Sequence, residues 1–429
     1  LTLLELQLLA RRTLSTPSRH NLAPPSYPAL LTSLFVLLKN VGELMKDYQQ
    51  IQAIYVHTPF CVQKCLYCDF ASYACRDVSV MERYADAVCK EIAAGGAVRL
   101  SVNPNATIYF GGGTPSTLPI ECIAKIVGAL KEYKFWQQPA EATIEVNPGT
   151  ADLEKLKALC ALGFDRISFG VQSLNDSELK TIGRIHSAQE ALQALAWAKE
   201  AGFTRISADL IYALPGQTLE SLRQTLEELV ATGIEHISVY GLILEEGTPL
   251  EKLVREGKLT LPDEDTAADM YELVQDFLRE QGFERYEISN YAKNEQYSKH
   301  NLVYWQYQPY AAFGAAACGF DGASRFTANS DVETYIAQAG NDTIYNEENL
   351  SKQELLGEFM FMGLRKSSGA NLKEARERFG VDVLEHFASE MEPFFQNGML
   401  LYDSERDVLK LTERGMELGN LIFEIFVTV

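Results

Sequence analysis

Three cysteines lie close together in the sequence, at Cys61, Cys65 and Cys68. Their thiolates can converge on one metal centre if the chain between them forms a loop. A single zinc ion would need a fourth ligand, and none follows at a matching spacing, since Cys75 lies further along the chain. A 4Fe–4S cluster on three cysteines leaves one iron open to a small molecule. The spacing therefore predicts such a cluster, with three unrelated cysteines as the alternative.

Glycine or polar residues follow several later strand-like runs. They stand at Gly111–Ser116, Glu145–Gly149 and Gly170–Ser173, while Asp209 lies inside a further run and Arg184 begins the helix before that run. A glycine run after a strand lets a ligand approach the backbone, and the absence of a following Gly-Lys-Ser/Thr excludes a Walker loop. Each signal alone is typical of a turn or a cap. Together they predict one site, because the carboxyl ends of parallel barrel strands share a face.

Strand-like and helix-like segments alternate between residues 51 and 285. The strands are expected at Ile51–His57, Thr107–Phe110, Thr143–Val146, Arg166–Phe169, Arg205–Leu214 and His236–Ile243, and helices at Met81–Ala94, Leu153–Leu162, Ala188–Ala201, Leu219–Ala231 and Asp265–Gln281. This alternation is typical of βαβ units with a parallel sheet. Right-handed crossovers would curl six units into a partial (β/α)6 barrel over residues 45–285, and an open doubly wound sheet is the alternative.

The C-terminal part of the chain has a different pattern. A linker region is expected at 286–345, followed by a small helical, winged-helix-like domain at 346–429. Its expected elements are the helices Ser351–Leu364, Asn371–Phe379 and Leu384–Asn397, the hairpin strands Met399–Tyr402 and Val408–Leu411, and a last helix capped by Thr412. Because the chain is acidic, we expect this domain to act as a lid or protein contact rather than to bind DNA.

The composition narrows the class of protein. With 38 Lys and Arg against 58 Asp and Glu, the formal net charge of −20 disfavours nucleic-acid binding. Hydrophobic residues at 47% and charged residues at 22% predict a folded globular chain. No apolar run reaches membrane-helix length, Leu31–Leu38 being the longest candidate, and no signal peptide stands out. We therefore expect a cytoplasmic protein with reduced cysteines, in which a cysteine cluster indicates a metal centre.

Residues 1–44 differ from the rest of the sequence, because they lack an initiating Met and contain four prolines. We expect Met45 to be the working start and residues 1–44 to be an N-terminal extension that is not native. A native N-terminal helix packed on the domain is the alternative.

The chain resembles the radical S-adenosylmethionine (SAM) superfamily. The resemblance rests on the motif Cys61-x3-Cys65-x2-Cys68, with Tyr67 before the last cysteine. It extends over about residues 51–425 and is strongest to the oxygen-independent coproporphyrinogen III oxidase-like proteins, including their heme-chaperone branch. The supporting segments are Tyr55–Phe60, Gly111–Ser116, Glu145–Gly149, Ser168–Ser173, Asp209–Gly216, Tyr286–Asn290 and Leu411–Gly415.

The resemblance implies cofactors and a site. Cys61, Cys65 and Cys68 would hold the 4Fe–4S cluster, and the amino and carboxylate groups of SAM would complete its open iron. The residues implied to contact SAM are Tyr55, Tyr67, Gly111, Gly112, Gly113, Thr114, Glu145, Gln172, Arg184, Asp209 and Ile243. One-electron reduction would then cleave the sulfonium to give a 5′-deoxyadenosyl radical.

Two features separate the oxidase from the chaperone. The oxidases carry a further cysteine two residues after the third, where this chain has Phe70. His300–Trp305 matches the His-Asn-x-x-Tyr-Trp motif linked to heme binding in the chaperone branch. His300 would offer an imidazole to the heme iron, and Tyr304 and Trp305 would pack on the porphyrin. The alternative is a partly buried His capping a turn, with Tyr and Trp in the core.

One position departs from the resemblance. Cys318 stands in Gly314–Gly319 where the family usually has the histidine of Gly-Ala-His-Ser. Cys318 would replace it as a thiolate ligand or, alternatively, be a small buried residue.

Three functions follow as hypotheses. The first is a chaperone that carries heme as cargo to a membrane-associated hemoprotein, with the chain itself peripheral at the membrane and homodimeric. The second is oxidative decarboxylation of coproporphyrinogen III in porphyrin biosynthesis. The third is a radical enzyme acting on another substrate.

Overall fold

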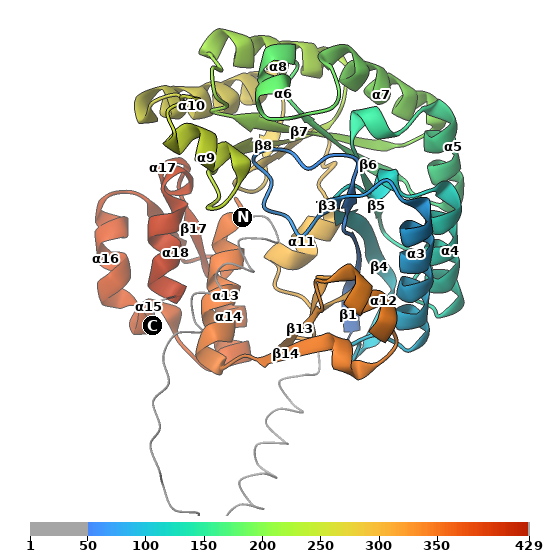
Figure 1. Cartoon of the computed structure of the whole chain (residues 1–429). Helices are drawn as coiled ribbons and strands as arrows, with labels where there is room; N and C mark the ends of the chain where they lie inside the picture. Colours follow the sequence, from blue (N-terminus) through green and yellow to red (C-terminus); the bar gives the residue numbers. More distant parts are fainter. Residues whose placement is uncertain (1–49, 428–429) are drawn as a thin grey trace, which may run out of the picture. The chain divides into compact units, whose positions relative to one another are not determined.

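A computed structural model describes residues 50–427 (Figure 1). The expectations for residues 1–44, for Met45 as the start and for the apolar run Leu31–Leu38 therefore lie outside the described residues.

Six parallel strands form the centre of the fold. They are β1 (Gln50–Thr58), β4 (Ser101–Gly112), β5 (Ala142–Val146), β6 (Arg166–Gln172), β7 (Arg205–Tyr212) and β8 (His236–Gly241). They lie side by side in this order, and each neighbouring pair is parallel. The strand order follows the sequence without a reversal, so the predicted partial barrel is confirmed and the doubly wound sheet is wrong.

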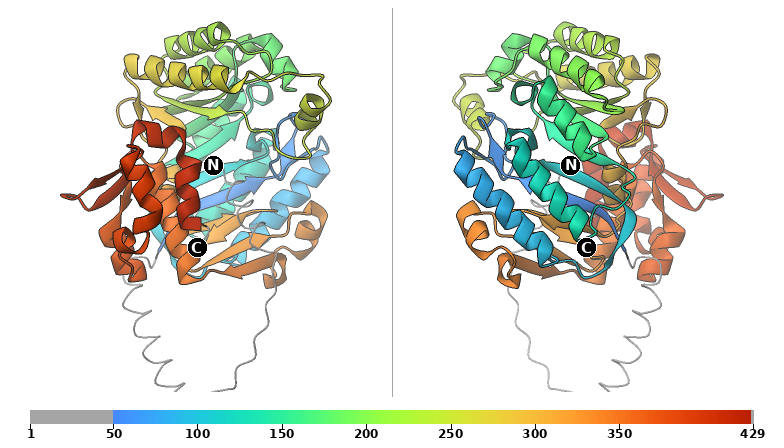
Figure 2. Two further views of the ribbon diagram at one scale, coloured as in Figure 1. Left: turned by 90° about the vertical axis from the view of Figure 1, so that its left-hand side faces the viewer. Right: turned by 90° about the vertical axis from the view of Figure 1, so that its right-hand side faces the viewer.

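Helices cover the outer face of these strands (Figure 2). They are α3 (Val78–Ala93), α4 (Ile120–Glu132), α5 (Leu153–Leu162), α6 (Asp176–Thr181), α7 (Ala188–Ala201), α8 (Leu219–Ala231) and α10 (Glu264–Glu280). All of them except α4 begin at a side-chain N-cap, which accepts a hydrogen bond from a backbone N–H of the first turn. The caps are Asp77, Asp152, Asn175, Ser187, Thr218 and Asp263. The sequence analysis did not predict α4.

The segment expected to be a linker region adds strands to both edges of the barrel sheet. β9 (Glu284–Arg285) and β10 (Asn290–Ala292) extend the β8 edge, and β11 (Tyr310–Phe313) pairs in parallel with β1. The sheet continues antiparallel through β12 (Cys318–Phe320), β13 (Ser324–Ala328) and β14 (Tyr345–Asn349). Between the two edges, α11 (Lys299–Trp305) contacts β1 and β4 and lies in the middle of the ring of strands in Figure 1.

A buried carboxylate fastens this extension to the barrel. Glu91 of α3 is fully buried and accepts hydrogen bonds from Tyr335, Tyr345 and the backbone N–H of Gly314, the last at 2.8 Å. Burial raises the pKa of Glu91. The loop that leads to Cys318 is therefore held by α3, far from it in sequence.

The C-terminal segment is mainly helical around a small sheet. Its elements are α13 (Lys352–Arg365), β15 (Ala370–Asn371), α14 (Leu372–Phe379), α15 (Val383–His386), α16 (Ala388–Gln396), β16 (Leu400–Asp403), β17 (Val408–Leu411), α17 (Glu413–Glu417) and α18 (Gly419–Val427). Thr412 caps α17 as predicted. The helix expected over 384–397 is two helices, separated at Phe387, whose ring packs against Phe426.

The remaining elements are short. They are β2 (Phe60–Cys61), β3 (Tyr73–Ala74), α9 (Pro249–Arg255), α12 (Val332–Gln338) and the 3₁₀ turns Pro115–Thr117, Pro148–Thr150 and Asp342–Ile344. Over residues 50–427, none of the helices combines the length and apolar character needed to cross a bilayer.

The contact between α13 and α18 leaves no room for a side chain at Gly357. A Cβ there would lie 2.2 Å from the carbonyl oxygen of Phe426, a backbone atom that cannot turn aside. We expect Gly357→Ala to lower the free energy of unfolding by about 1–3 kcal/mol. Gly128→Ala on α4 is the control, because nothing lies within 4 Å of its Cβ and helical alanine should stabilise by about 0.5–1 kcal/mol. Equal urea midpoints for the two variants would contradict this packing.

Candidate functional site

The cysteine loop is attached to the glycine run through the backbone. Cys61 ends β2, and Cys65 and Cys68 follow in the loop before β3. The N–H of Gly113 donates to the carbonyl of Thr58 at 2.7 Å, and that of Thr114 donates to the carbonyl of Phe60 at 2.8 Å. The Thr114 hydroxyl also lies 3.5 Å from the Cys61 sulfur. The two motifs predicted from separate parts of the sequence therefore form one site.

Glycine is required where β4 ends. Gly112 has a φ of +111°, and a Cβ there would lie 2.6 Å from the His57 ring. At Gly113 a Cβ would lie 2.8 Å from the Phe60 carbonyl oxygen and 3.1 Å from the Cys61 sulfur. Side chains here would displace the cysteine loop, so the glycines allow the close approach of the two segments.

A buried arginine lies against the cysteine loop. Nη1 of Arg184 is 3.3 Å from the Cys65 sulfur, Nη2 donates to the carbonyl of Gly170, and Nε is buried without a partner. Gln172 lies beside the same glycine, at a β-bulge, with a φ of +67°. Burial raises the pKa of Tyr67, which faces Arg184 and Cys65. A guanidinium with a free buried N–H suits a carboxylate ligand.

Two acidic side chains lie on the inner face of the barrel. Glu145 accepts a hydrogen bond from the Tyr109 hydroxyl at 2.6 Å and one from the Gly112 N–H at 3.2 Å. Burial raises the pKa of Glu145 to about 7. Asp209 accepts from the Ser168 hydroxyl at 3.1 Å, and burial raises its pKa as well. Carboxylates held in this way can accept hydrogen bonds from an amino group or from ribose hydroxyls.

The remaining predicted SAM contacts lie at different depths. Tyr55 is buried, its hydroxyl is 3.0 Å from Nδ1 of His57, and its ring stacks on Tyr109 at 6.2 Å. Ile243 follows β8 and is 55% exposed, so it lies at the rim rather than within the barrel.

The three cysteines suit a cluster better than one ion. In the part of the chain that the structure describes, no three His, Cys, Asp or Glu side chains come close enough to share a single metal ion. An iron–sulfur cage spaces its thiolates more widely, and thiolate is the donor it takes. All three cysteines are free thiols. Burial raises the pKa of Cys61 and raises that of Cys68 to about 11, so metal binding would have to deprotonate both.

His300 is enclosed at the barrel interior. It is 0% exposed, with Nδ1 2.8 Å from the Thr107 hydroxyl and Nε2 2.8 Å from the Tyr304 hydroxyl. Its ring packs on Tyr109 with 4.9 Å between centroids. Burial lowers the pKa of His300 to about 3, so the imidazole is neutral. Both ring nitrogens are thus occupied in this conformation.

The other end of α11 contacts the C-terminal segment. The Arg365 guanidinium of α13 lies 4.5 Å from the Trp305 ring centroid and pairs with buried Glu287 at 3.3 Å. The Trp305 Nε1 and the Arg365 Nε are buried without a partner. The indole is therefore packed against a cation and lacks an exposed face in this conformation.

Cys318 is buried in β12, opposite Thr327 of β13. Burial raises the pKa of its thiol. Its side chain is 8% exposed, which favours the small buried residue among the two expectations for this position.

The chain is similar to known proteins over most of its length. Residues 55–229 match the radical SAM superfamily, and residues 350–418 match the HemN C-terminal domain. The heme chaperone HemW of Lactococcus lactis is 35% identical over 88% of this chain and 98% of its own length. That of Bacillus subtilis is 37% identical over 88% and 99%. The chain belongs to the HemW family of radical SAM proteins.

A solved structure supports the HemW-family fold. The coproporphyrinogen III oxidase HemN of Escherichia coli superposes with a TM-score of 0.76, at 22% identity, over 92% of this chain and 93% of that one. This likeness shows the fold alone. Membership of the superfamily implies a 4Fe–4S cluster and SAM as cofactors.

Sequence reasoning missed residues that hold the predicted ones in place. Tyr109 contacts Tyr55, Glu145 and His300, and Glu141 accepts hydrogen bonds from the N–H groups of Lys299 and His300. The strand period could have found Tyr109, because it lies two residues before Gly111 and shares its face. Nothing local marks Glu141, whose partners lie 158 and 159 residues away.

Replacing one cysteine of the loop should remove the cluster. After anaerobic reconstitution we expect Cys68→Ala to lose the iron and sulfide that the unaltered chain retains, because the donor set falls to two. Cys75→Ala is the matched control. Cys75 is also a free, partly buried cysteine, and its backbone N–H donates to the carbonyl of Cys61 at 2.9 Å. Iron and sulfide analysis decides. Full iron content in Cys68→Ala, or equal loss in Cys75→Ala, would refute the assignment.

SAM affinity should depend on pH through Glu145. With a pKa of about 7, the carboxyl is increasingly protonated below pH 7 and then no longer accepts from an amino group. We expect SAM binding to weaken about tenfold from pH 8 to pH 6. In Glu145→Gln the affinity should be lower and this change largely absent. Titration of SAM itself is common to both proteins, so equal pH profiles by equilibrium dialysis would exclude Glu145 as the acceptor.

Proposed function

We propose that this protein binds heme and passes it to a recipient hemoprotein. The observation that carries the proposal is that α11 contains the His-Asn-x-x-Tyr-Trp motif, in a chain that belongs to the HemW family. Two bacterial relatives that match this chain over almost their whole length are named heme chaperones. A membrane-associated recipient and a homodimer are parts of the same proposal.

The site geometry supports an assignment of the cofactor residues. We assign Cys61, Cys65 and Cys68 to the cluster, and the glycine run with Glu145, Gln172, Arg184 and Asp209 to SAM. The cluster and SAM together supply one-electron chemistry when bound. Arg184 would pair with the methionine carboxylate of SAM while its guanidinium lies beside the Cys65 sulfur. Glu145 accepts from the amino group, and Asp209 accepts from the ribose.

Heme ligation by His300 requires a local rearrangement. Nε2 faces the Tyr304 hydroxyl at 2.8 Å and Nδ1 faces Thr107 at the same distance, so iron must replace one of these partners. Nε2 is the better candidate, because Tyr304 lies on the same helix and is only partly buried. The neutral imidazole is already the form that binds iron.

The oxidase alternative has less support. Its distinguishing Cys-x-Cys is absent, since Phe70 stands at the second position. The likeness to HemN is a likeness of fold at 22% identity.

An anaerobic heme titration followed by absorbance tests the proposal. We expect saturable binding to the unaltered chain and at least about tenfold weaker binding to His300→Ala. Tyr304→Phe should retain heme and bind it up to about fivefold tighter, because one competing hydrogen bond of about 1 kcal/mol is gone. His386→Ala is the matched control for histidines on the surface.

The opposite results are equally clear. Binding by His300→Ala at the original affinity would exclude His300 as the ligand, and loss of binding in Tyr304→Phe would assign the iron to the phenol. If the chain binds no heme but forms a vinyl product from coproporphyrinogen III with SAM and reductant, the oxidase function replaces the chaperone.

A further inference from the structure

The base of the barrel contains a cavity at the end opposite the cysteine loop. Its volume is about 190 Å³, and it lies where β6, β7 and β8 begin. The charged and polar groups on its wall include Arg166, Lys199, Arg205, Glu235, His236 and Gln296. Arg205 is paired with Glu141 and Asp165, so Arg166 and Lys199 are the cations of the wall that form no ion pair among the described residues.

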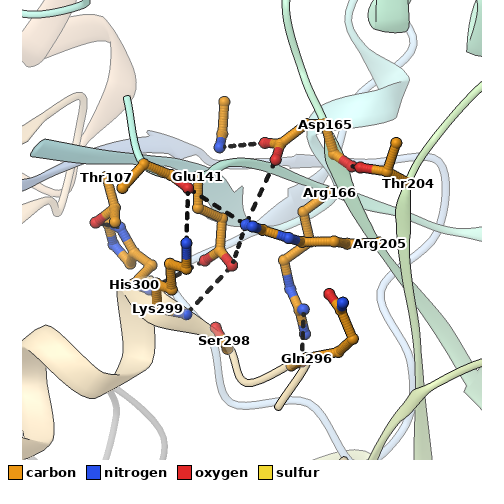
Figure 3. A network of polar contacts seen from close by, with 12 residues as sticks. Thr107, Glu141, Asp165, Arg166, Thr204, Arg205, Gln296, Ser298, Lys299 and His300 are labelled. Atoms are coloured by element: carbon orange, nitrogen blue, oxygen red, sulfur yellow. Dashed lines mark hydrogen bonds and ion pairs between the residues drawn. The ribbon is translucent and has the colours of Figure 1, made fainter. Parts of the chain in front are cut away.

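Arg166 is the decisive residue of this cavity. It is 2% exposed, yet it makes one hydrogen bond, from Nη1 to the carbonyl of Gln296 at 3.4 Å (Figure 3). Among the described residues, no carboxylate lies within ion-pair distance of its guanidinium. Burying a cation without a close ion-pair partner is unfavourable. A single long bond to a carbonyl does not offset that cost.

The neighbouring carboxylates are committed elsewhere. Glu141 and Asp165 pair with Arg205 at 3.3 and 3.4 Å, and Glu141 also accepts from the backbone at the start of α11. Figure 3 shows this separate network beside the Arg166 side chain. Glu235 on the cavity wall accepts from Asn294 at 2.6 Å. None of the three therefore pairs with Arg166. The charge of Arg166 acts on the pKa of buried Asp209, where it partly opposes the rise caused by burial, but the two groups form no ion pair.

The histidine on the wall supplies no negative charge either. His236 has Nδ1 2.7 Å from the Ser207 hydroxyl and Nε2 2.8 Å from the Tyr286 hydroxyl. Burial, followed by the nearby charge of Arg166, lowers its pKa. It therefore stays neutral and neither adds to nor offsets the charge of Arg166.

We propose that this cavity binds a small oxyanion, a phosphate or a short carboxylate, on Arg166 with Lys199 at the mouth. A guanidinium fork pairs with such an anion through two parallel hydrogen bonds. The cavity is too small for a porphyrin, so this site is separate from the heme site proposed above and does not depend on it. Lys199 is exposed and held by the carbonyl of Thr232.

The position of the site suggests a consequence for α11. Gln296, whose carbonyl Arg166 holds, lies two residues before the N-cap Ser298 of that helix. An anion would compete with this carbonyl for the guanidinium. Occupancy would therefore release one anchor of the segment that leads to His300.

Titration with sodium phosphate and with sodium acetate, each at constant ionic strength set by sodium chloride, tests the proposal. We expect a saturable rise in the thermal midpoint with at least one of the two anions, which also identifies the class. Arg166→Met keeps the side-chain length without charge, and its affinity should fall at least about tenfold. Lys199→Glu should weaken binding, whereas Lys352→Gln, an exposed lysine of α13, should not.

Two results would overturn the site. One is the absence of saturable stabilisation by either anion in the unaltered chain, and the other is unchanged affinity in Arg166→Met. If Arg166→Met does not fold, crystals grown in selenate decide together with Lys199→Glu. Anomalous density beside Arg166 supports the site, and an empty cavity with Lys199→Glu binding as before refutes it.

Discussion

The backbone contact between β1 and β4 is the constraint on which the site depends. The two strands run parallel, and their carboxyl ends continue as the cysteine loop and the glycine run. The N–H groups of Gly113 and Thr114 donate to the carbonyls of Thr58 and Phe60, which lead into the cysteine loop. This contact requires that Gly112 and Gly113 have no side chains, since a Cβ would meet the His57 ring or the Phe60 carbonyl. The position of the three potential cluster ligands therefore depends on the absence of a Cβ at Gly112 and Gly113, which lie at and just after the end of β4.

The same strand carries this constraint into the barrel. Tyr109 lies two residues before Gly111, donates to Glu145 at 2.6 Å and packs against both Tyr55 and His300. One side chain thus contacts the residues proposed for SAM and the residue proposed for heme. Any movement of His300 changes the packing of a phenol that holds Glu145 in place. The two cofactor regions are consequently joined by direct contact, with no need for a long chain of intermediates.

Local signals explain which parts of the fold could be predicted. The helix Leu153–Leu162 was predicted with its observed bounds, because Asp152 caps its start and Gly163, with a φ of +113°, ends it. The helix α4 was missed, and its N-cap residue is Pro119, which makes no side-chain cap hydrogen bond. The short strands at 290–328 gave no periodic signal, since β10, β11 and β12 are buried on both faces. They form because barrel edges distant in sequence are available for pairing.

The residue types of the site were predictable, but their availability was not. The spacing of the cysteines and glycines could be read directly, because neighbouring strand ends bring them together. Whether His300 has a free nitrogen depends on Thr107, which is 193 residues away in sequence. Whether Arg166 has a counter-ion depends on how Glu141 and Asp165 are shared with Arg205. Such facts are properties of tertiary partners, and the sequence around each residue does not contain them.

The anchors of α11 determine what heme binding would cost. Glu141 holds its first turn, Arg365 covers Trp305 near its end, and His300 makes two hydrogen bonds of about 1 kcal/mol each. An iron–imidazole bond would have to exceed these interactions before heme could load. The same interactions would favour release once a recipient offered its own ligand. A histidine held in this way suits a carrier, which must give up its cargo, better than a permanent heme protein.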